Sequence, residues 1–164
     1  MEEALKGMVV LVDTREQPTH ALHERCQAFG VWDRQKLDAG DYSAKFLLPS
    51  GDWYQLPVAV ERKYGLDELC NCFCQQRKRF EREFNRAAAA KVKLYLLVEG
   101  ATWENVYAGR YRPRMNPKSL TASMLAWLAR YDCQILFCKK ETSGKLIRDI
   151  LFREGKERLL ALEK

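Results

Sequence analysis

The stretch Val58-Ala59-Val60-Glu61-Arg62-Lys63 is the most informative part of this sequence for its fold. The apolar run predicts a buried strand, and the three charged residues predict its end. Because side chains alternate between the two faces of a strand, Glu61 and Lys63 share one face, roughly 6–7 Å apart, while Arg62 points to the other. An acid and an ammonium group that close together can hold a divalent cation and orient an attacking water molecule.

Further acids precede this strand at two positions where other strands are expected to begin or end. Val12-Asp13-Thr14-Arg15-Glu16 closes an apolar run, and Gly40-Asp41-Tyr42 opens a second one. Mg²⁺ keeps several of its waters in proteins, so two or three carboxylates suffice to bind it. Asp41 and Glu61 are the expected metal ligands. Asp13 and Glu16 complete the site if the first strand runs beside the strand that starts after Asp41.

These residues have the chemistry of a phosphodiester-cleaving site. Carboxylates that hold one or two Mg²⁺ ions can supply a nucleophilic water and neutralise charge on the phosphate, and Lys63 adds positive charge. Arg15 and Arg62 are candidates to order the carboxylates or to grip a phosphate. The competing interpretation of Glu61 and Lys63 is a solvated strand end with a surface ion pair, which contributes little energy.

Hydrophobic periodicity predicts a single α/β domain. Strands are expected at 8–12, 32–37, 42–48, 53–63, 92–99 and 133–138, and helices at 18–30, 66–90, 119–130, 141–152 and 155–162. A turn at 49–52 makes the first half an antiparallel hairpin, whereas strands alternating with helices favour parallel pairing in the second half. The expected architecture is a mixed β-sheet flanked by helices.

Composition fits a folded protein with a polyanionic partner. The 164 residues are 47% hydrophobic and 30% charged, with a formal net charge of +6. The charged N-terminus lacks a secretory h-region and no apolar run reaches membrane-spanning length, so a cytoplasmic location is expected. A zinc site usually needs two short pairs of Cys or His ligands, and the six cysteines do not supply two such pairs. They are therefore expected to be reduced thiols.

The three acidic motifs resemble those of the nuclease domain of XPF-type structure-specific endonucleases, within the PD-(D/E)xK superfamily. The motifs are V-D-x-R-E at 12–16, L-x-x-G-D-Y at 37–42 and E-R-K-x-x-x-D-L from Glu61, whose final leucine falls at Leu69 instead of directly after Asp67. The resemblance covers roughly residues 9–152. The run Asn116-Pro117-Lys118-Ser119-Leu120 is similar to the small stand-alone members of phages and bacteria.

The resemblance implies a restriction-endonuclease-like fold and one nuclease domain over residues 1–164, with a core at about 8–153. It also implies a Mg²⁺- or Mn²⁺-dependent endonuclease that acts on branched or flapped DNA, as a homodimer. Carried over by motif, the catalytic set is Asp13, Arg15, Glu16, Asp41, Glu61, Arg62 and Lys63, with Asp41, Glu61 and Asp13 as metal ligands. Asp67 also matches, but at the start of a helix its carboxylate suits a capping role.

Two basic segments are candidate DNA contacts. Arg77, Arg79 and Arg82 lie on the long predicted helix, where Arg77 interrupts the apolar stripe, and Arg110, Arg112 and Arg114 lie among aromatic residues in a later connection. A solvated helix face and a loop whose aromatics pack onto the core are the competing interpretations. The family places an arginine and a glutamine on this helix, to which Arg79 and Glu83 are the nearest fit.

Three functions fit these observations. The first is a metal-dependent endonuclease that cuts near junctions of duplex and single-stranded DNA. The second is a non-catalytic DNA-binding or scaffold module of the same fold, although inactive family members usually lose acids that this chain keeps. The third is a sequence-specific, restriction-type nuclease. The family's paired helix-hairpin-helix motifs are not expected within these 164 residues.

Overall fold

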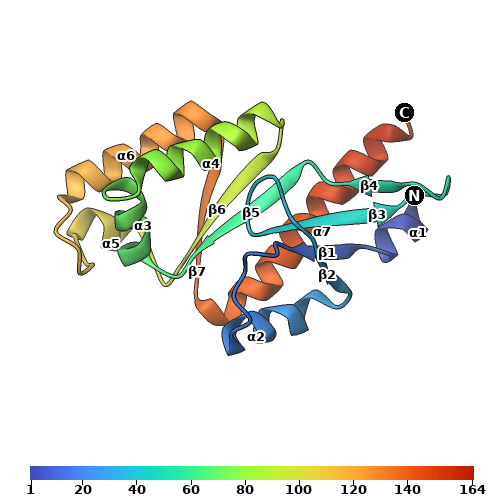
Figure 1. The fold of residues 1–164 in the computed structure, drawn as a ribbon, viewed down its shortest axis with the longest axis horizontal. Helices are drawn as coiled ribbons and strands as arrows, with labels where there is room; N and C mark the ends of the chain where they lie inside the picture. Colours follow the sequence, from blue (N-terminus) through green and yellow to red (C-terminus); the bar gives the residue numbers. More distant parts are fainter.

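The computed structural model describes residues 1–164 and contains one mixed sheet of seven strands with helices on both faces (Figure 1). The strand order is β2-β1-β3-β5-β6-β7, and β4 pairs with β3. The strands are β1 (Val9–Val12), β2 (Trp32–Arg34), β3 (Tyr42–Leu47), β4 (Trp53–Gln55), β5 (Val58–Lys63), β6 (Lys93–Glu99) and β7 (Gln134–Cys138). The predicted fold class, a mixed α/β sheet, is confirmed.

The direction of the strands follows the prediction in both halves of the chain. In the first half β3 runs antiparallel to β1, β4 and β5, and in the second half β5, β6 and β7 are parallel. The short edge strand β2 is parallel to β1, because helix α2 (His20–Phe29) crosses between them. Because β1 lies beside β3, Asp13 and Glu16 after β1 can share a site with Asp41, as the sequence prediction required.

Each face of the sheet has its own apolar core. On one face α1 (Glu2–Lys6), α2 and α7 (Lys140–Leu162) cover the β1, β3 and β5 side chains that include Val12, Tyr42 and Val60. On the other face α3 (Leu66–Phe73), α4 (Arg77–Ala89), α5 (Trp103–Ala108) and α6 (Pro117–Tyr131) surround Trp127. The second group of helices covers the β6 side of the sheet (Figure 1). The carboxyl-terminal end of β5 therefore remains accessible beside α3 and α4.

The long helix predicted over 66–90 is two helices, because the backbone leaves helical geometry at Cys74, where ψ is −91°. The bend lets Phe73 and Phe80 pack against Trp127, with ring centroids 4.9 and 5.7 Å from it. The apolar spacing continues through the break, so periodicity could not reveal it.

The two helices predicted over 141–152 and 155–162 are instead one helix, α7. Gly155 lies within α7 as a contact point and does not end the helix, since a Cβ there would lie 2.3 Å from the Phe46 ring. The strand predicted at 53–63 is interrupted between β4 and β5, and two short helices, α1 and α5, were not predicted. None of the helices has the length and apolar character that a membrane span requires, and all six cysteines are free.

Candidate active site

Three acids form a row across adjacent strands β1, β3 and β5. Val12 pairs with Tyr42 and Tyr42 pairs with Val60, so the next position on each strand brings Asp13, Asp41 and Glu61 side by side. Backbone hydrogen bonds extend the ladder by one step: the Asp13 amide donates to Asp41 and the Asp41 amide donates to Val60, both at 2.9 Å. Opposed residues in antiparallel strands share a face. The fold therefore gathers acids that are up to 48 positions apart in the sequence.

Gly40 makes the close approach of Asp41 to β5 possible. Its φ is +77°, a conformation that L side chains rarely adopt. A Cβ at this position would lie 2.7 Å from the Ala59 Cβ and 3.3 Å from the Val60 carbonyl oxygen. The glycine is thus a steric requirement for seating the loop on the strand that carries Glu61.

Asp41 and Glu61 lie close enough to repel each other. Burial and the Glu61 carboxylate hold the pKa of Asp41 well above its usual value, and burial also raises the pKa of Glu61. The Arg62 amide donates to Asp41 Oδ2 at 2.7 Å and fixes that carboxylate. Two carboxylates held together in a part-buried site are stabilised when a cation neutralises them.

Lys63 provides the cation nearest to Glu61. Its Nζ lies 3.1 Å from Glu61 Oε1 and 3.7 Å from Glu68 Oε1, and the two paired side chains Lys63 and Glu61 are only 11% and 12% exposed. Burial alone would lower the pKa of Lys63, but the surrounding negative groups, Glu61 foremost, outweigh burial and raise the pKa. The ion pair is therefore not the solvated surface pair of the competing interpretation.

Asp13 is the most fully engaged of the three acids. Its Oδ2 accepts from Arg15 Nε at 2.6 Å and from the Arg15 amide at 3.2 Å, and its Oδ1 accepts from the Leu37 amide at 2.9 Å. These bonds anchor the loop after β1 and orient the Arg15 side chain, which lines the same site. Within this arrangement Asp13 has fewer free lone pairs for a cation than Asp41 or Glu61.

Glu16 is held by Tyr42, a motif residue that had no role assigned from the sequence, and by Arg25, which the sequence did not identify. Tyr42 donates its hydroxyl to Glu16 Oε2 at 3.1 Å, and the buried Arg25 donates from Nε to that hydroxyl at 2.9 Å. Burial and Glu16 raise the pKa of Tyr42 above its usual range. The signal for Arg25 was its place beside Cys26 and three residues after Leu22 in the predicted helix 18–30, because a charged side chain next to such apolar positions needs a partner.

Arg62 points away from Glu61 and Lys63, as strand alternation predicts. On the opposite face its Nε donates to Glu99 Oε1 at 2.5 Å and its Nη2 donates to Glu99 Oε2 at 3.2 Å. The Glu99 side chain is 4% exposed. Sequence reasoning missed Glu99, although it ends an apolar strand next to Gly100, in the manner of the other acids.

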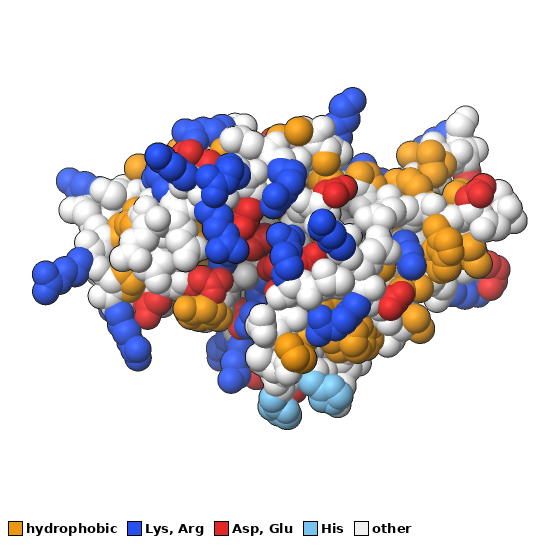
Figure 2. Space-filling view, in the orientation of Figure 1, with side chains coloured by type: hydrophobic (Ala, Val, Ile, Leu, Met, Phe, Trp, Pro, Cys, Tyr) orange, Lys and Arg blue, Asp and Glu red, His pale blue; other side chains and the backbone are white.

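The site opens into a cleft of about 480 Å³ between the acidic row and α4. Its lining includes the acids, Lys63, Arg15 and two arginines of α4, Arg79 and Arg86. In Figure 2, Lys and Arg side chains gather around acidic side chains in the middle of this face. Arg86 Nε donates to the Asp38 carbonyl at 2.8 Å and so ties α4 to the loop that carries Asp41.

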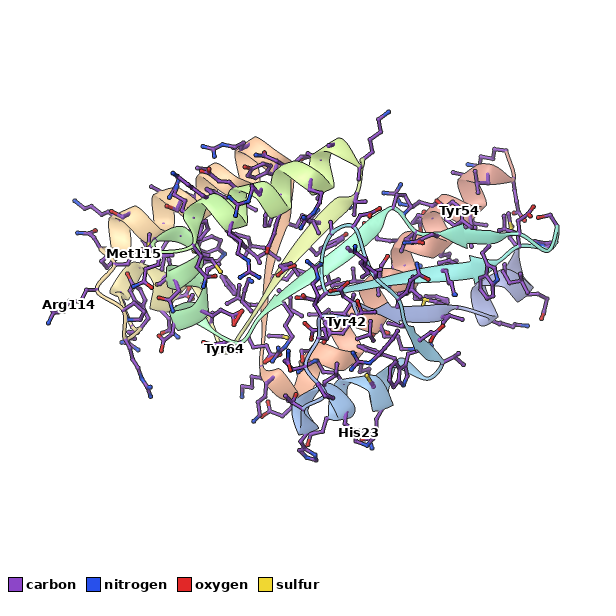
Figure 3. All side chains as sticks on the ribbon, viewed as in Figure 1. His23, Tyr42, Tyr54, Tyr64, Arg114 and Met115 are labelled. Carbon is purple, nitrogen blue, oxygen red and sulfur yellow. The ribbon has the colours of Figure 1, made fainter.

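The other candidate DNA-binding residues do not line this cleft. Arg77 packs its guanidinium 5.1 Å from the Trp127 ring centroid and pairs with Glu81, so it belongs to the contact between α4 and α6. Arg82 is exposed on α4. Arg110, Arg112 and Arg114 lie in the connection between α5 and α6, and Figure 3 shows Arg114 at the far end of the molecule from Tyr42.

Most aromatic residues between Trp103 and Arg114 pack onto the core, as the competing interpretation of this segment predicted. Trp103 packs edge-on against Phe137 at 5.4 Å and Tyr111 is partly buried against the core, whereas Tyr107 is 64% exposed. Asp67 accepts a hydrogen bond from the Arg112 amide at 3.0 Å. It therefore tethers this connection to α3, which agrees with a structural role.

The carboxylates fit a hard divalent cation that retains waters. No group of three His, Cys, Asp or Glu side chains is positioned to surround a metal ion. The fitting donors are the paired carboxylates of Asp41 and Glu61, whose raised pKa values reflect burial and nearby negative charge. Mg²⁺ needs only one or two protein carboxylates when water and phosphate oxygens supply the other ligands.

The fold and the acidic row define a protein of the XPF nuclease type. Residues 12–150 match the model of the ERCC4 domain, and the chain belongs to that family. Comparison with curated proteins finds no match.

Solved structures agree with this assignment. XPF from Aeropyrum pernix is 21% identical, with a TM-score of 0.62, over 92% of this chain and 69% of that one. The same protein in complex with DNA is 22% identical, with a TM-score of 0.63, over 92% of this chain and 66% of that one. At these identities the likeness establishes the fold, and this chain spans about two thirds of the length of those chains.

Proposed function

We propose that this protein is a metal-dependent endonuclease that hydrolyses phosphodiester bonds in DNA at branched, flap or fork structures. The observation that carries the proposal is the row Asp13, Asp41 and Glu61 beside Lys63, on the floor of a cleft bordered by arginines. Membership of the ERCC4 domain family supports it. The relative solved with DNA supports nucleic acid as the partner.

The residues divide into three roles. Asp41 and Glu61 would hold Mg²⁺ or Mn²⁺, which supplies a nucleophilic water and neutralises charge on the phosphate when it is bound. Lys63, held by Glu61 at 3.1 Å, places a positive charge next to the carboxylates and can orient a water or a phosphate oxygen. Arg15, Arg79 and Arg86 line the cleft and suit the phosphates of a bound strand.

Asp13, Glu16 and Arg62 act as positioning residues in this proposal. Asp13 orients Arg15, and Glu16 is bound to the Tyr42 hydroxyl. The Arg62 amide holds Asp41, while its side chain is fixed to Glu99 on the other face. Substitution of these residues changes the shape of the site without removing a group that contacts substrate.

The decisive experiment measures cleavage of flap, fork, Holliday-junction and linear duplex DNA with Mg²⁺, Mn²⁺ or EDTA. We expect metal-dependent cleavage of the branched substrates and a loss on the order of 10²-fold or more in Glu61→Gln. Asp149→Asn, on the exposed face of α7, is the control. Binding without cleavage in either metal would instead indicate the scaffold module. Equal cleavage of linear duplex at one recurrent sequence would indicate a restriction-type nuclease.

Two further predictions are part of the proposal, and the first of them rests on the family resemblance. We expect a homodimer, which light scattering on the purified protein would detect as a mass of twice 19.1 kDa. We also expect a cytoplasmic location, where the protein has access to DNA.

A further inference from the structure

The two sides of the cleft differ in chemistry. The α4 side carries the guanidinium groups of Arg79 and Arg86, which suit phosphates. The side at the end of β5 carries three exposed uncharged groups: the ring of Tyr64 and the amides of Asn71, on α3, and Gln76, just before α4. The Glu68 carboxylate also lines this side, and it is paired with Lys63. Uncharged donors and acceptors beside an aromatic ring match a nucleobase better than a phosphate.

Tyr64 has the position that a base contact next to the site requires. It follows Lys63 directly, at the point where β5 ends and the chain turns into α3 (Figure 3).

The ring itself remains available. Tyr64 is 62% exposed, which is high for so large an apolar surface, and neither core cluster includes it. A base inside a continuous duplex is stacked on both faces and cannot receive the ring. An unpaired base at a branch, gap or flap offers a free face.

We propose that Tyr64, with Asn71 and Gln76, forms a subsite that takes one unpaired nucleobase next to the scissile phosphate. The inference rests on the proposed nuclease function, because it assigns the scissile phosphate to the adjoining acidic row. Tyr64 stacks on the base, and the two amides bind its polar edge. This subsite makes unpaired DNA a better substrate than an intact duplex.

The first test measures binding in EDTA, so it does not depend on catalysis. Flap and fork DNA carry 2-aminopurine, whose fluorescence falls on stacking, at each position around the junction. We expect wild type and Tyr64→Phe to quench one unpaired position and Tyr64→Ala to lose that quenching. Tyr107→Ala removes an equally exposed tyrosine, 64% exposed, on α5 and serves as the matched control.

The second test measures kcat/KM on the same DNA, after the wild-type cut position is mapped. We expect Tyr64→Ala to lose roughly 10- to 100-fold on unpaired substrate, with Tyr64→Phe near wild type. An abasic nucleotide beside the cut should cause a similar loss in wild type and little further loss in Tyr64→Ala, because both changes remove the same contact.

The outcomes separate this inference from the proposed function. Quenching that persists in Tyr64→Ala, or additive losses from the variant and the abasic nucleotide, overturns the stacking subsite. Equal losses on unpaired and fully paired DNA also overturn it. Tyr64-dependent quenching without cleavage in Mg²⁺ or Mn²⁺ supports the subsite and overturns the nuclease. The absence of any DNA binding overturns both.

Discussion

Arg62 forms a bidentate ion pair with Glu99 on the face of the sheet opposite to the acidic row. Its Nε and Nη2 lie 2.5 and 3.2 Å from the two Glu99 oxygens, and its backbone amide donates to Asp41 on the other side. One residue thus connects the proposed metal-binding carboxylate with the core between the sheet and α7. Arg62, the middle residue of E-R-K, therefore holds Asp41 through its amide and Glu99 through its side chain.

Removing one member of this pair should destabilise the protein strongly. We expect Glu99→Leu to lower the free energy of unfolding by about 3–5 kcal/mol, because a buried guanidinium would lose its counter-charge. Urea denaturation measures the change. The double variant Arg62→Met/Glu99→Leu should recover much of the loss, whereas Glu3→Gln, in an exposed pair with Lys6, should change stability by less than about 1 kcal/mol. A double variant as unstable as Glu99→Leu would contradict this account.

Gly40→Ala should disturb the site through a steric conflict with β5. The added Cβ would meet the Ala59 Cβ at 2.7 Å, in a backbone with φ of +77°. We expect a loss of about 2–4 kcal/mol in unfolding free energy, from the positive φ and from overpacking together. Gly51→Ala, with φ of +92° and nothing within 4 Å, carries only the conformational cost. Similar losses in the two variants, by urea denaturation, would refute the role given to Ala59.

Arg79 and Arg86 should contribute to DNA affinity, whereas Arg77 should contribute to stability. If each of the two cleft arginines contacts a phosphate, alanine at either position reduces the slope of log K against log salt by about 1. Arg77→Ala should leave that slope unchanged and lower the melting temperature, because the guanidinium packs on Trp127. Fluorescence anisotropy titrations from 50 to 200 mM salt, with thermal melts, distinguish the two effects. A reduced slope in Arg77→Ala would place the DNA path along α6 instead.

Glu154 should make stability depend on pH in the acid range. Burial alone would raise its pKa, but hydrogen bonds from Lys93 and Tyr95 outweigh burial and lower the pKa below 4.5. The ionised form therefore stabilises the fold at pH values above about 4.5, and this contribution disappears as pH falls through the lowered pKa. Glu154→Gln should be less stable than wild type at pH 7, and the difference should shrink below pH 4. A constant difference in urea denaturation would contradict this assignment.

Lys63→Met should separate the charge of the ammonium group from its packing. The methionine retains most of the aliphatic stem but removes the ammonium group, which lies 5.3 Å from the Phe80 ring centroid and pairs with Glu61. We expect cleavage to fall on the order of 10²-fold, while DNA binding in EDTA changes little. Single-turnover cleavage and anisotropy binding measure the two effects. Parallel losses of binding and cleavage would make Lys63 a phosphate-binding residue.

The sequence predicted those parts of the fold that depend on local patterns. Apolar runs located five strands near their observed bounds, and alternation along β5 correctly separated Arg62 from Glu61 and Lys63. Helix ends were predicted less accurately. The break at Cys74 and the continuous helix through Gly155 depend on contacts with Trp127 and Phe46. Those contacts come from distant segments, which local periodicity does not encode.

For the site, the sequence by itself determined which residue types were present and which strand ends carried them. Only the tertiary structure decided that the register of β1, β3 and β5 aligns Asp13, Asp41 and Glu61, and that Asp13 is occupied by Arg15 and the Leu37 amide. It also decided that Arg77 packs inside while Arg79 lines the cleft. The physical reason is that local chemistry fixes the direction of a side chain along its own strand or helix, whereas its partner is fixed by strand pairing and helix packing between distant segments.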